Sequence, residues 1–170
     1  MFRKQTMIGR SQMGFYSLED LVPQDHLLRH IDQYVDFEFI YDLVRDKYSL
    51  EQGRPSLDPV MLIKLPIIQY LFGIQSMRQT IKEIKVNVAY RWFLGLDFQD
   101  EVPHFTTFGK NYSRRFKDTD LFEQSFYRIL DQVFEAKLVE PRDWFILTGR
   151  TLKHMPIAIN LIIKKLRLKP

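Results

Sequence analysis

Apolar residues recur along most of the chain at the spacing of one helical face. Between Asp25 and Val35 they fall at positions 27, 28, 31, 34 and 35, and the stretch 37–48 repeats that period. Residues three and four apart share one side of an α-helix, so both stretches are predicted to be amphipathic helices. A longer one is predicted from about 118 to 137, with these residues facing inward: Leu121, Phe122, Phe126, Ile129, Leu130, Val133 and Phe134.

Capping residues predict where the central helix begins and ends. Asp58 precedes Pro59, and Asp caps helix N-termini while Pro suits the first helical position. The segment that follows, to about Phe72, is apolar nearly all round, which indicates a buried helix. Pro66 inside it predicts a kink or a split, because proline removes a helical hydrogen bond. Gly73 is predicted to end the helix.

Further capping residues and prolines predict the helices before and after this central helix. Ser76 is the predicted cap of the next helix, and Asn87 caps a short one over 88–94 that ends at Gly95. After an acidic loop at 97–104, Thr106 or Thr107 is predicted to cap a helix that runs to about 116. Residues 17–22 predict a short helical turn closed by a proline, with Asp25 as a natural cap or ion-pair partner in the helix that follows. No strand pattern precedes residue 144, so the body is predicted to be all-α.

Composition narrows the class of protein without fixing it. The chain has 170 residues, 45% of them hydrophobic, which suffices for a folded core. It has no cysteine, which excludes disulfides and thiolate metal sites, and no apolar run long enough to span a bilayer. Its net charge of +4 is a weak indication of nucleic-acid binding, because 25 basic residues face 21 acidic ones. We expect a soluble cytoplasmic protein with no cofactor.

The short helix at 88–94 and the basic helix at 106–116 have the character of a helix-turn-helix element. In that motif the second helix enters the major groove, and contacts to the DNA backbone fix the register. Lys110, Arg114 and Arg115 would meet phosphates, and Asn111 would contact an adenine edge. The connection is longer than the usual tight turn, and a plain solvated basic face explains the same residues equally well.

No catalytic or metal site is evident in the sequence. His26 and His30 are spaced like a metal-binding pair on a helix, but no third ligand follows at a suitable distance, so they are interpreted as structural. The acidic residues at 97–101 share one loop, which does not make a two-metal site. No glycine-rich phosphate loop and no serine-nucleophile motif are present.

Several ordered motifs between residues 53 and 116 resemble the InsH-like N-terminal domain of DDE-type insertion-sequence transposases, and a looser likeness covers 1–140. The matching segments are Gly53-Arg-Pro-Ser-Leu-Asp-Pro-Val-Met-Leu, Gln69-Tyr-Leu-Phe-Gly-Ile, Ser76-Met-Arg-Gln-Thr-Ile, Asn87-Val-Ala-Tyr-Arg-Trp-Phe-Leu-Gly-Leu and Pro103-His-Phe-Thr-Thr-Phe-Gly-Lys-Asn-Tyr-Ser-Arg-Arg-Phe. The family usually has Ser where Phe105 stands, a departure that bears only on the cap of that helix.

The resemblance implies a domain that binds the element's terminal inverted repeats. Phosphate contacts are expected from Arg78, Lys82, Lys110, Arg114 and Arg115, and base contacts from Gln79 and Asn111. The chain is expected to be inactive in DNA cleavage by itself, and to form homo-oligomers or pair with intact transposase. Two alternatives stay open: a fragment that inhibits intact transposase, and a helical protein-interaction module without a DNA role.

In the family, an RNase H-like catalytic core follows, and its first metal-binding Asp lies in a strand that reads D-G-T-H-(I/L)-K-A-x-A-N. Here residues 147–160 read Leu-Thr-Gly-Arg-Thr-Leu-Lys-His-Met-Pro-Ile-Ala-Ile-Asn, so the Asp is missing. Read one base out of frame, residues 148–157 permit D-G-T-H-L-K-A-H-A-N. We interpret this as a frameshift near 141–144, which makes residues 141–170 an out-of-frame tail. The rest of the chain is predicted to be a flexible N-terminus (1–16) followed by a helical domain (17–140). A natural strand-plus-tail extension is the alternative.

Overall fold

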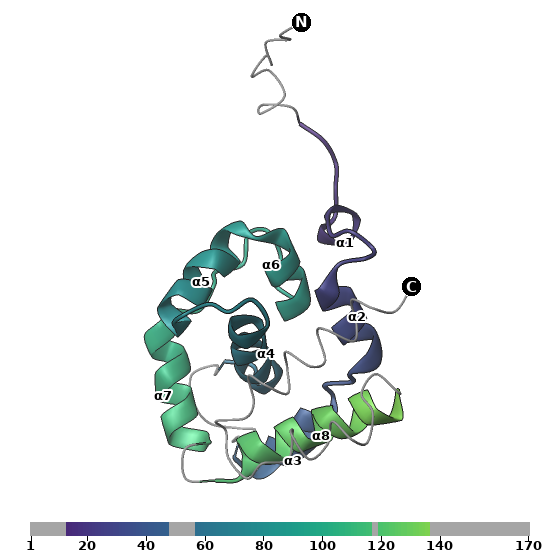
Figure 1. Cartoon of the computed structure of the whole chain (residues 1–170). Helices are drawn as coiled ribbons and strands as arrows, with labels where there is room; N and C mark the ends of the chain where they lie inside the picture. The colour runs from purple at the N-terminus through teal and green to yellow at the C-terminus, as the bar shows by residue number, and fades with distance from the viewer. Residues whose placement is uncertain (1–12, 48–56, 117–118, 137–170) are drawn as a thin grey trace, which may run out of the picture.

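The structure is a computed structural model that describes residues 13–47, 57–116 and 119–136. These residues form eight α-helices and one 3₁₀ helix, with no strand among them, which confirms the all-α prediction for the described part of the chain (Figure 1). The elements in chain order are α1 (Leu18–Leu21), α2 (Leu27–Tyr34), α3 (Phe39–Val44), η2 (Arg45–Lys47), α4 (Pro59–Leu71), α5 (Met77–Val86), α6 (Val88–Leu94), α7 (Phe105–Arg115) and α8 (Leu121–Glu135).

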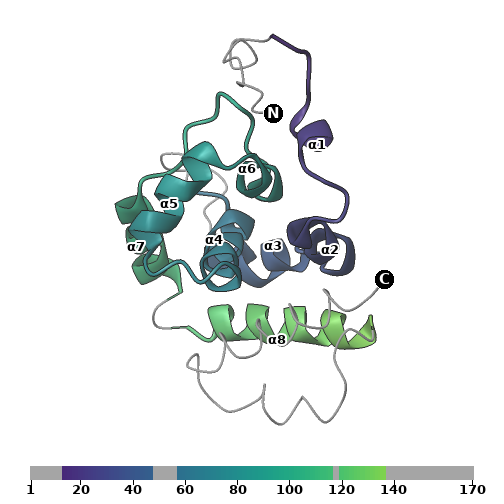
Figure 2. The same cartoon turned by 45° about the horizontal axis from the view of Figure 1, so that its top comes forward.

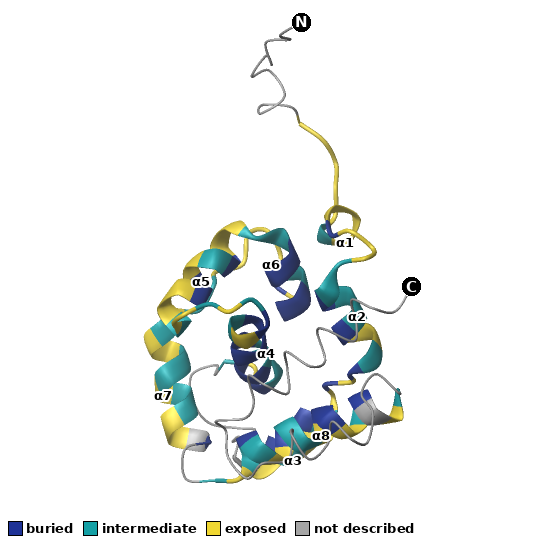
Figure 3. Ribbon diagram, viewed as in Figure 1, coloured by how far each residue is buried: buried dark blue, intermediate teal, exposed yellow. Residues whose placement is uncertain are grey.

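The core is built around α4, as its uninterrupted apolar sequence predicts. Leu65 and Ile68 are fully enclosed, and the helix contacts α3, α5 and α6 (Figure 3). Each buried Leu or Ile side chain contributes roughly 1.5–3 kcal/mol to folding, so α4 is the main source of hydrophobic stabilisation. Phe37 and Phe93 add an edge-to-face ring pair at a centroid distance of 5.9 Å.

Pro66 does not divide α4, so the predicted split is wrong. The helix runs without interruption from Pro59 to Leu71, with Pro66 buried inside it. A mid-helix proline costs about 3 kcal/mol, because it removes one backbone hydrogen bond and crowds the preceding turn. The burial of α4 on nearly all sides offsets that cost.

Three of the predicted helix caps are confirmed. The Asp58 carboxylate accepts hydrogen bonds from the backbone N–H groups of α4, and Pro59 occupies the first helical position. Ser76 caps α5 and Asn87 caps α6, in each case through a side-chain oxygen. Gly95 ends α6 with φ = 70°, a left-handed conformation that favours glycine.

Two helices are capped by histidine instead of the residues predicted. His26, not Asp25, caps α2: its Nδ1 accepts a hydrogen bond from the backbone N–H of Leu28 at 3.2 Å. Burial lowers the pKa of His26, which keeps the ring neutral and able to accept. His104, and not a threonine, caps α7 in the same way, and Phe105 takes the first helical position. Asp, Asn, Ser and Thr lead the capping preferences, so residue statistics favoured the wrong residues.

The other predicted elements are confirmed with shorter bounds. The segment predicted over 37–48 forms only α3 and the 3₁₀ turn η2, and α8 covers 121–135 of the predicted 118–137. α8 packs on α3, and Gln132 exchanges two hydrogen bonds with the backbone of Asp36. The predicted tail (141–170) and most of the predicted flexible N-terminus (1–16) lie outside the described residues.

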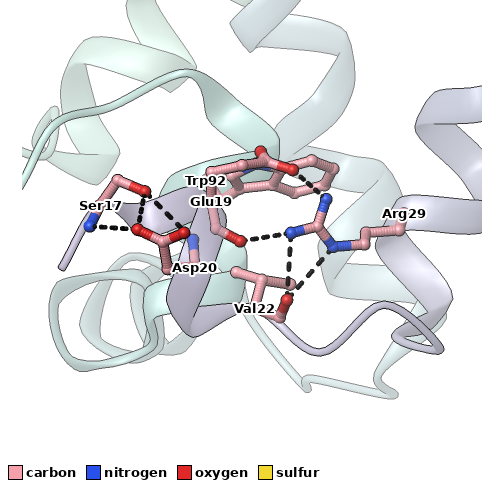
Figure 4. Close-up of polar contacts among 6 residues, drawn as sticks. All are labelled: Ser17, Glu19, Asp20, Val22, Arg29 and Trp92. Carbon is pink, nitrogen blue, oxygen red and sulfur yellow. Dashed lines mark hydrogen bonds and ion pairs between the residues drawn. The ribbon is translucent and has the colours of Figure 1, made fainter.

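The short helix α1 is fastened to α2 and α6 by polar contacts (Figure 4). Ser17 and Asp20 form a reciprocal capping box at its start. The Glu19 carboxylate accepts hydrogen bonds from the Arg29 guanidinium and the Trp92 indole N–H. Arg29 also donates to the carbonyl oxygen of Val22 at 3.0 Å, and it lies 4.7 Å from the centre of the Trp92 ring.

Candidate nucleic-acid interface

The outer face of α5 carries the first group of predicted DNA contacts. Arg78, Gln79 and Lys82 are exposed, and Lys85 continues the same face. The inward face buries Thr80, Ile81 and Ile84, so the helix is fixed to the core on one side only. Lys82 is four residues after Arg78 and three after Gln79, and Lys85 is three residues further, so the four side chains project from the same side of the helix.

The second group of predicted contacts lies on α7. Lys110 and Arg114 are exposed, whereas Asn111 is half-buried and its side-chain amide donates to the carbonyl oxygen of Thr107 at 2.9 Å. The Arg115 side chain lies outside the described part of the structure.

α5 and α7 meet near the first turn of each helix and follow one another along one edge of the molecule (Figure 1). The guanidinium of Arg78 sits over the Phe105 ring at 4.6 Å from the ring centre, which ties the first turn of α5 to the first turn of α7. The structure therefore brings the two sequence-predicted groups onto adjoining helices. Lys85, absent from the set of predicted contacts, belongs with them, and its helical spacing from Lys82 was the available signal.

Three basic side chains elsewhere in the described residues are neutralised by carboxylates, in contrast to those of this edge. Arg29, Arg45 and Lys64 are each paired with a carboxylate, at Glu19, Asp42 and Asp32. In the same part of the chain, no ion pair engages these five basic residues of the edge: Arg78, Lys82, Lys85, Lys110 and Arg114. Unpaired cations gathered on two adjoining helices create a positive potential that attracts polyanions.

Acidic side chains reach the basic edge at Glu83, on α5 itself, and at the connection between α6 and α7. The buried guanidinium of Arg91 donates to the backbone carbonyl oxygens of Asp97 and Asp100 and so fixes this connection. A cleft of about 730 Å³ separates it from α5, lined by Lys85 on one wall and by Asp100 and Glu101 on the other. The carboxylates thus mark one border of the basic edge.

An apolar cavity of about 270 Å³ lies behind the basic edge. Pro66 and Tyr70 of α4 line it together with Phe108 and Tyr112 of α7 and Phe122 of α8. The Tyr112 and Phe122 rings meet edge to face at a centroid distance of 5.6 Å. These aromatic contacts hold α7 against the body of the molecule and leave its basic side exposed.

The described residues hold no group of three His, Asp or Glu side chains positioned to bind a metal ion. His26 and His104 instead serve as helix caps, in line with a structural interpretation of His26. Among the helices that the structure describes, none is both long enough and apolar enough to cross a bilayer.

The family model described as Transposase domain (DUF772) matches residues 16–114, more than half of the chain, from before α1 into the last turn of α7. No curated protein and no solved structure matches. The basic edge formed by α5 and α7 therefore lies within the family domain, whereas α8 lies beyond it.

Proposed function

The chain belongs to the DUF772 transposase-domain family, and from that membership we propose that it is the DNA-binding N-terminal part of an insertion-sequence transposase. The proposal extends to the DDE class and to the InsH-like type of N-terminal domain, on the strength of the ordered motifs between residues 53 and 116. Its role is to recognise the terminal inverted repeats of the element. By itself it neither cleaves nor joins DNA.

The observation that carries the proposal is the cluster of unpaired cations on α5 and α7. Arg78, Lys82, Lys110 and Arg114 are exposed, and α7 contains no acidic residue at all. A surface of this kind neutralises phosphates and releases their counterions, which supplies much of the affinity of DNA-binding proteins. Gln79 brings a side-chain amide to the same edge, and amides are the usual readers of adenine.

A titration of DNA against the whole chain at several salt concentrations tests the proposal. The probes are short duplexes tiled across the DNA that flanks the gene, together with scrambled duplexes of equal composition. Wild-type protein should bind one or two flanking duplexes more tightly than their scrambled counterparts. The affinity should fall about three- to fourfold per phosphate contact when the salt concentration rises from about 50 to 200 mM.

The double variant Lys85→Ala/Lys110→Ala should reduce the salt dependence by about two phosphate contacts. Arg45→Ala/Arg128→Ala is the matched control: it removes the same charge, but from η2 and α8, away from the basic edge. Both pairs are exposed, and circular dichroism checks that each variant stays folded. Equal losses in the two variants would show that net charge, not this edge, governs binding. The absence of binding in the wild type would refute the proposal.

A second candidate function is association with another copy of the chain or with intact transposase. The specific observation is the exposed apolar segment before α1, where Met13, Phe15 and Tyr16 lack the cover of a core. In this role the chain would inhibit transposition by forming mixed oligomers. Co-expression with intact transposase, with wild-type chain compared to Phe15→Ser, separates this role from DNA binding, since the substitution leaves the basic edge intact.

A further inference from the structure

The connection between α4 and α5 has the features of the turn in a helix-turn-helix motif. Residues 72–76 join the two helices, and Gly73 among them has φ = 62°. The backbone N–H of Ile74 donates to the carbonyl oxygen of Gln69 at 2.9 Å, which closes the end of α4. Ser76 then caps α5. Short turns with a glycine are typical of helix-turn-helix pairs.

The two helices also have the relation that the motif requires. α4 is foreshortened in Figure 1 while α5 lies across the view, so their axes cross, and they pack directly against each other. α6 and α7 do not form such a pair: residues 95–104 separate them, and the helix that α7 contacts most is α5. α6 itself buries Ala89, Phe93 and Leu94 and has little surface to present to DNA.

We infer that α4 and α5 form the helix-turn-helix of this chain and that α5, not α7, enters the major groove of DNA. The inference rests on the proposed function and locates the DNA-reading element within it. Side chains near the start of the second helix contact base edges in this motif. On α5 these are Arg78, Gln79 and Lys82, all exposed and all on the outward face.

The exposed residues that follow Arg78 on α5 then differ in the contacts they make. Gln79 is the adenine reader, and its amide is held by Glu83, whose carboxylate accepts from Gln79 Nε2 at 2.7 Å. Lys82 lies one turn further and reaches a guanine edge. Lys85 meets a phosphate, and Val86, whose side chain is 80% exposed, offers an apolar contact for a thymine methyl group.

α7 provides the backbone contacts that fix the register. In the usual motif the first helix crosses the DNA backbone, but here α4 is buried on nearly all sides and has no basic residue except Lys64, which is paired with Asp32. α7 lies beside α5 and is joined to it by the Arg78–Phe105 contact. Lys110 and Arg114 therefore reach the phosphates that border the groove occupied by α5.

Selection from a pool of duplexes with randomised sequence distinguishes the role of α5 in reading bases from the role of α7 in contacting phosphates. The full-length wild-type protein should enrich a defined sequence. Gln79→Ala and Lys82→Ala should each lose the preference at one or two positions and bind the selected duplex about tenfold more weakly. Lys110→Ala and Arg114→Ala should keep the selected sequence unchanged, weaken binding to all duplexes alike and lower the salt dependence.

The opposite result, altered base preference in the α7 variants and none in the α5 variants, would overturn the inference and leave the proposed function standing. Failure of the wild type to retain any duplex would overturn both.

A second measurement uses the absence of cysteine in the chain. Lys82→Cys should form a disulfide with a thiol tethered to cytosine N4, which lies in the major groove, and Lys110→Cys should not. The reverse pattern would place α7 in the groove.

Discussion

Glu19 is the residue that fastens α1 to the rest of the molecule. Its carboxylate accepts from Arg29 on α2 and from Trp92 on α6, which are distant in sequence but meet at this point (Figure 4). The hydrogen bond from Arg29 is the main reason that the pKa of Glu19 lies below its ordinary value of 4.5. A carboxylate held in this way stabilises the folded chain only while it is ionised.

Glu19→Gln is expected to lower the thermal unfolding midpoint at neutral pH. The pKa of Glu19 is depressed in the folded state, so its contribution is fully present above pH 4.5 and is lost as the pH falls through the folded-state pKa. Wild type and variant should therefore differ at pH 7 and converge at low pH. Unfolding curves followed by circular dichroism at both pH values test this. A constant difference at every pH would assign the effect to packing instead of charge.

At the scale of the elements, two glycines have opposite conformational needs. Gly73 lies between α4 and α5 with a left-handed backbone, whereas Gly109 lies inside α7, where glycine is a poor helix former. Neither position has a heavy atom within 4 Å of where a Cβ would be built. Differences between their alanine variants therefore report backbone conformation and not steric conflict.

Gly73→Ala is expected to reduce the free energy of unfolding by about 1 kcal/mol, because alanine is strained at positive φ. Gly109→Ala is expected to raise it by about 0.5–1 kcal/mol, because alanine is the better helix former. Urea titration of both variants measures the two values. Stabilisation by Gly73→Ala would mean that the turn does not need its left-handed residue, and it would weaken the helix-turn-helix inference.

The local sequence pattern predicted which segments are helical, but it did not predict the features that depend on contacts between helices. Asp58 and Asn87 were found as caps because each is a strong capping residue in front of an apolar period. The cap at His104 was missed because histidine is not among the leading capping residues, although its Nδ1 accepts from the backbone N–H of Thr106. The continuity of α4 through Pro66 was missed because the compensating contacts come from other helices.

The candidate site likewise depends on contacts that the local sequence pattern does not predict. Helical spacing alone put Arg78, Gln79 and Lys82 on one face of a helix, and the structure agrees. That this face adjoins α7 depends on the Arg78–Phe105 contact and on the aromatic residues that seat α7 against α4. Such pairings join distant parts of the chain, so no local pattern encodes them.

At the scale of the whole molecule, the five cations of the basic edge lie apart from cations that carboxylates neutralise. No ion pair engages the cations on α5 and α7 in the described residues, whereas on the side of α1 and α2 Arg29 is paired with Glu19 and Lys64 with Asp32 (Figures 1 and 2). The net charge of +4 conceals this separation. A molecule polarised in this way turns its positive edge towards DNA as it approaches, so a modest net charge is compatible with DNA binding.

The gene between codons 141 and 157 tests how the helical domain relates to a catalytic core. Trp144 followed by Phe145 forces a valine codon in the shifted frame, and Met155 followed by Pro156 forces an alanine codon, whichever synonymous codons are used. The other positions from 148 to 157 permit, without forcing, the family's D-G-T-H strand. A frameshift at 141–144 predicts that the gene has the permitted base at every one of these codons.

Sequencing the gene and the DNA downstream of it decides between the two interpretations of residues 141–170. If a frameshift separated the core from this domain, the shifted frame should remain open well beyond codon 170 and encode the further Asp and Glu of a three-carboxylate site that binds two metal ions. Restoring that frame by one inserted or deleted base should then yield a longer protein with metal-dependent DNA cleavage. If the shifted frame instead meets early stop codons and encodes no such carboxylates, residues 141–170 are a native extension of the chain. The chain then acts through α5 and α7 alone.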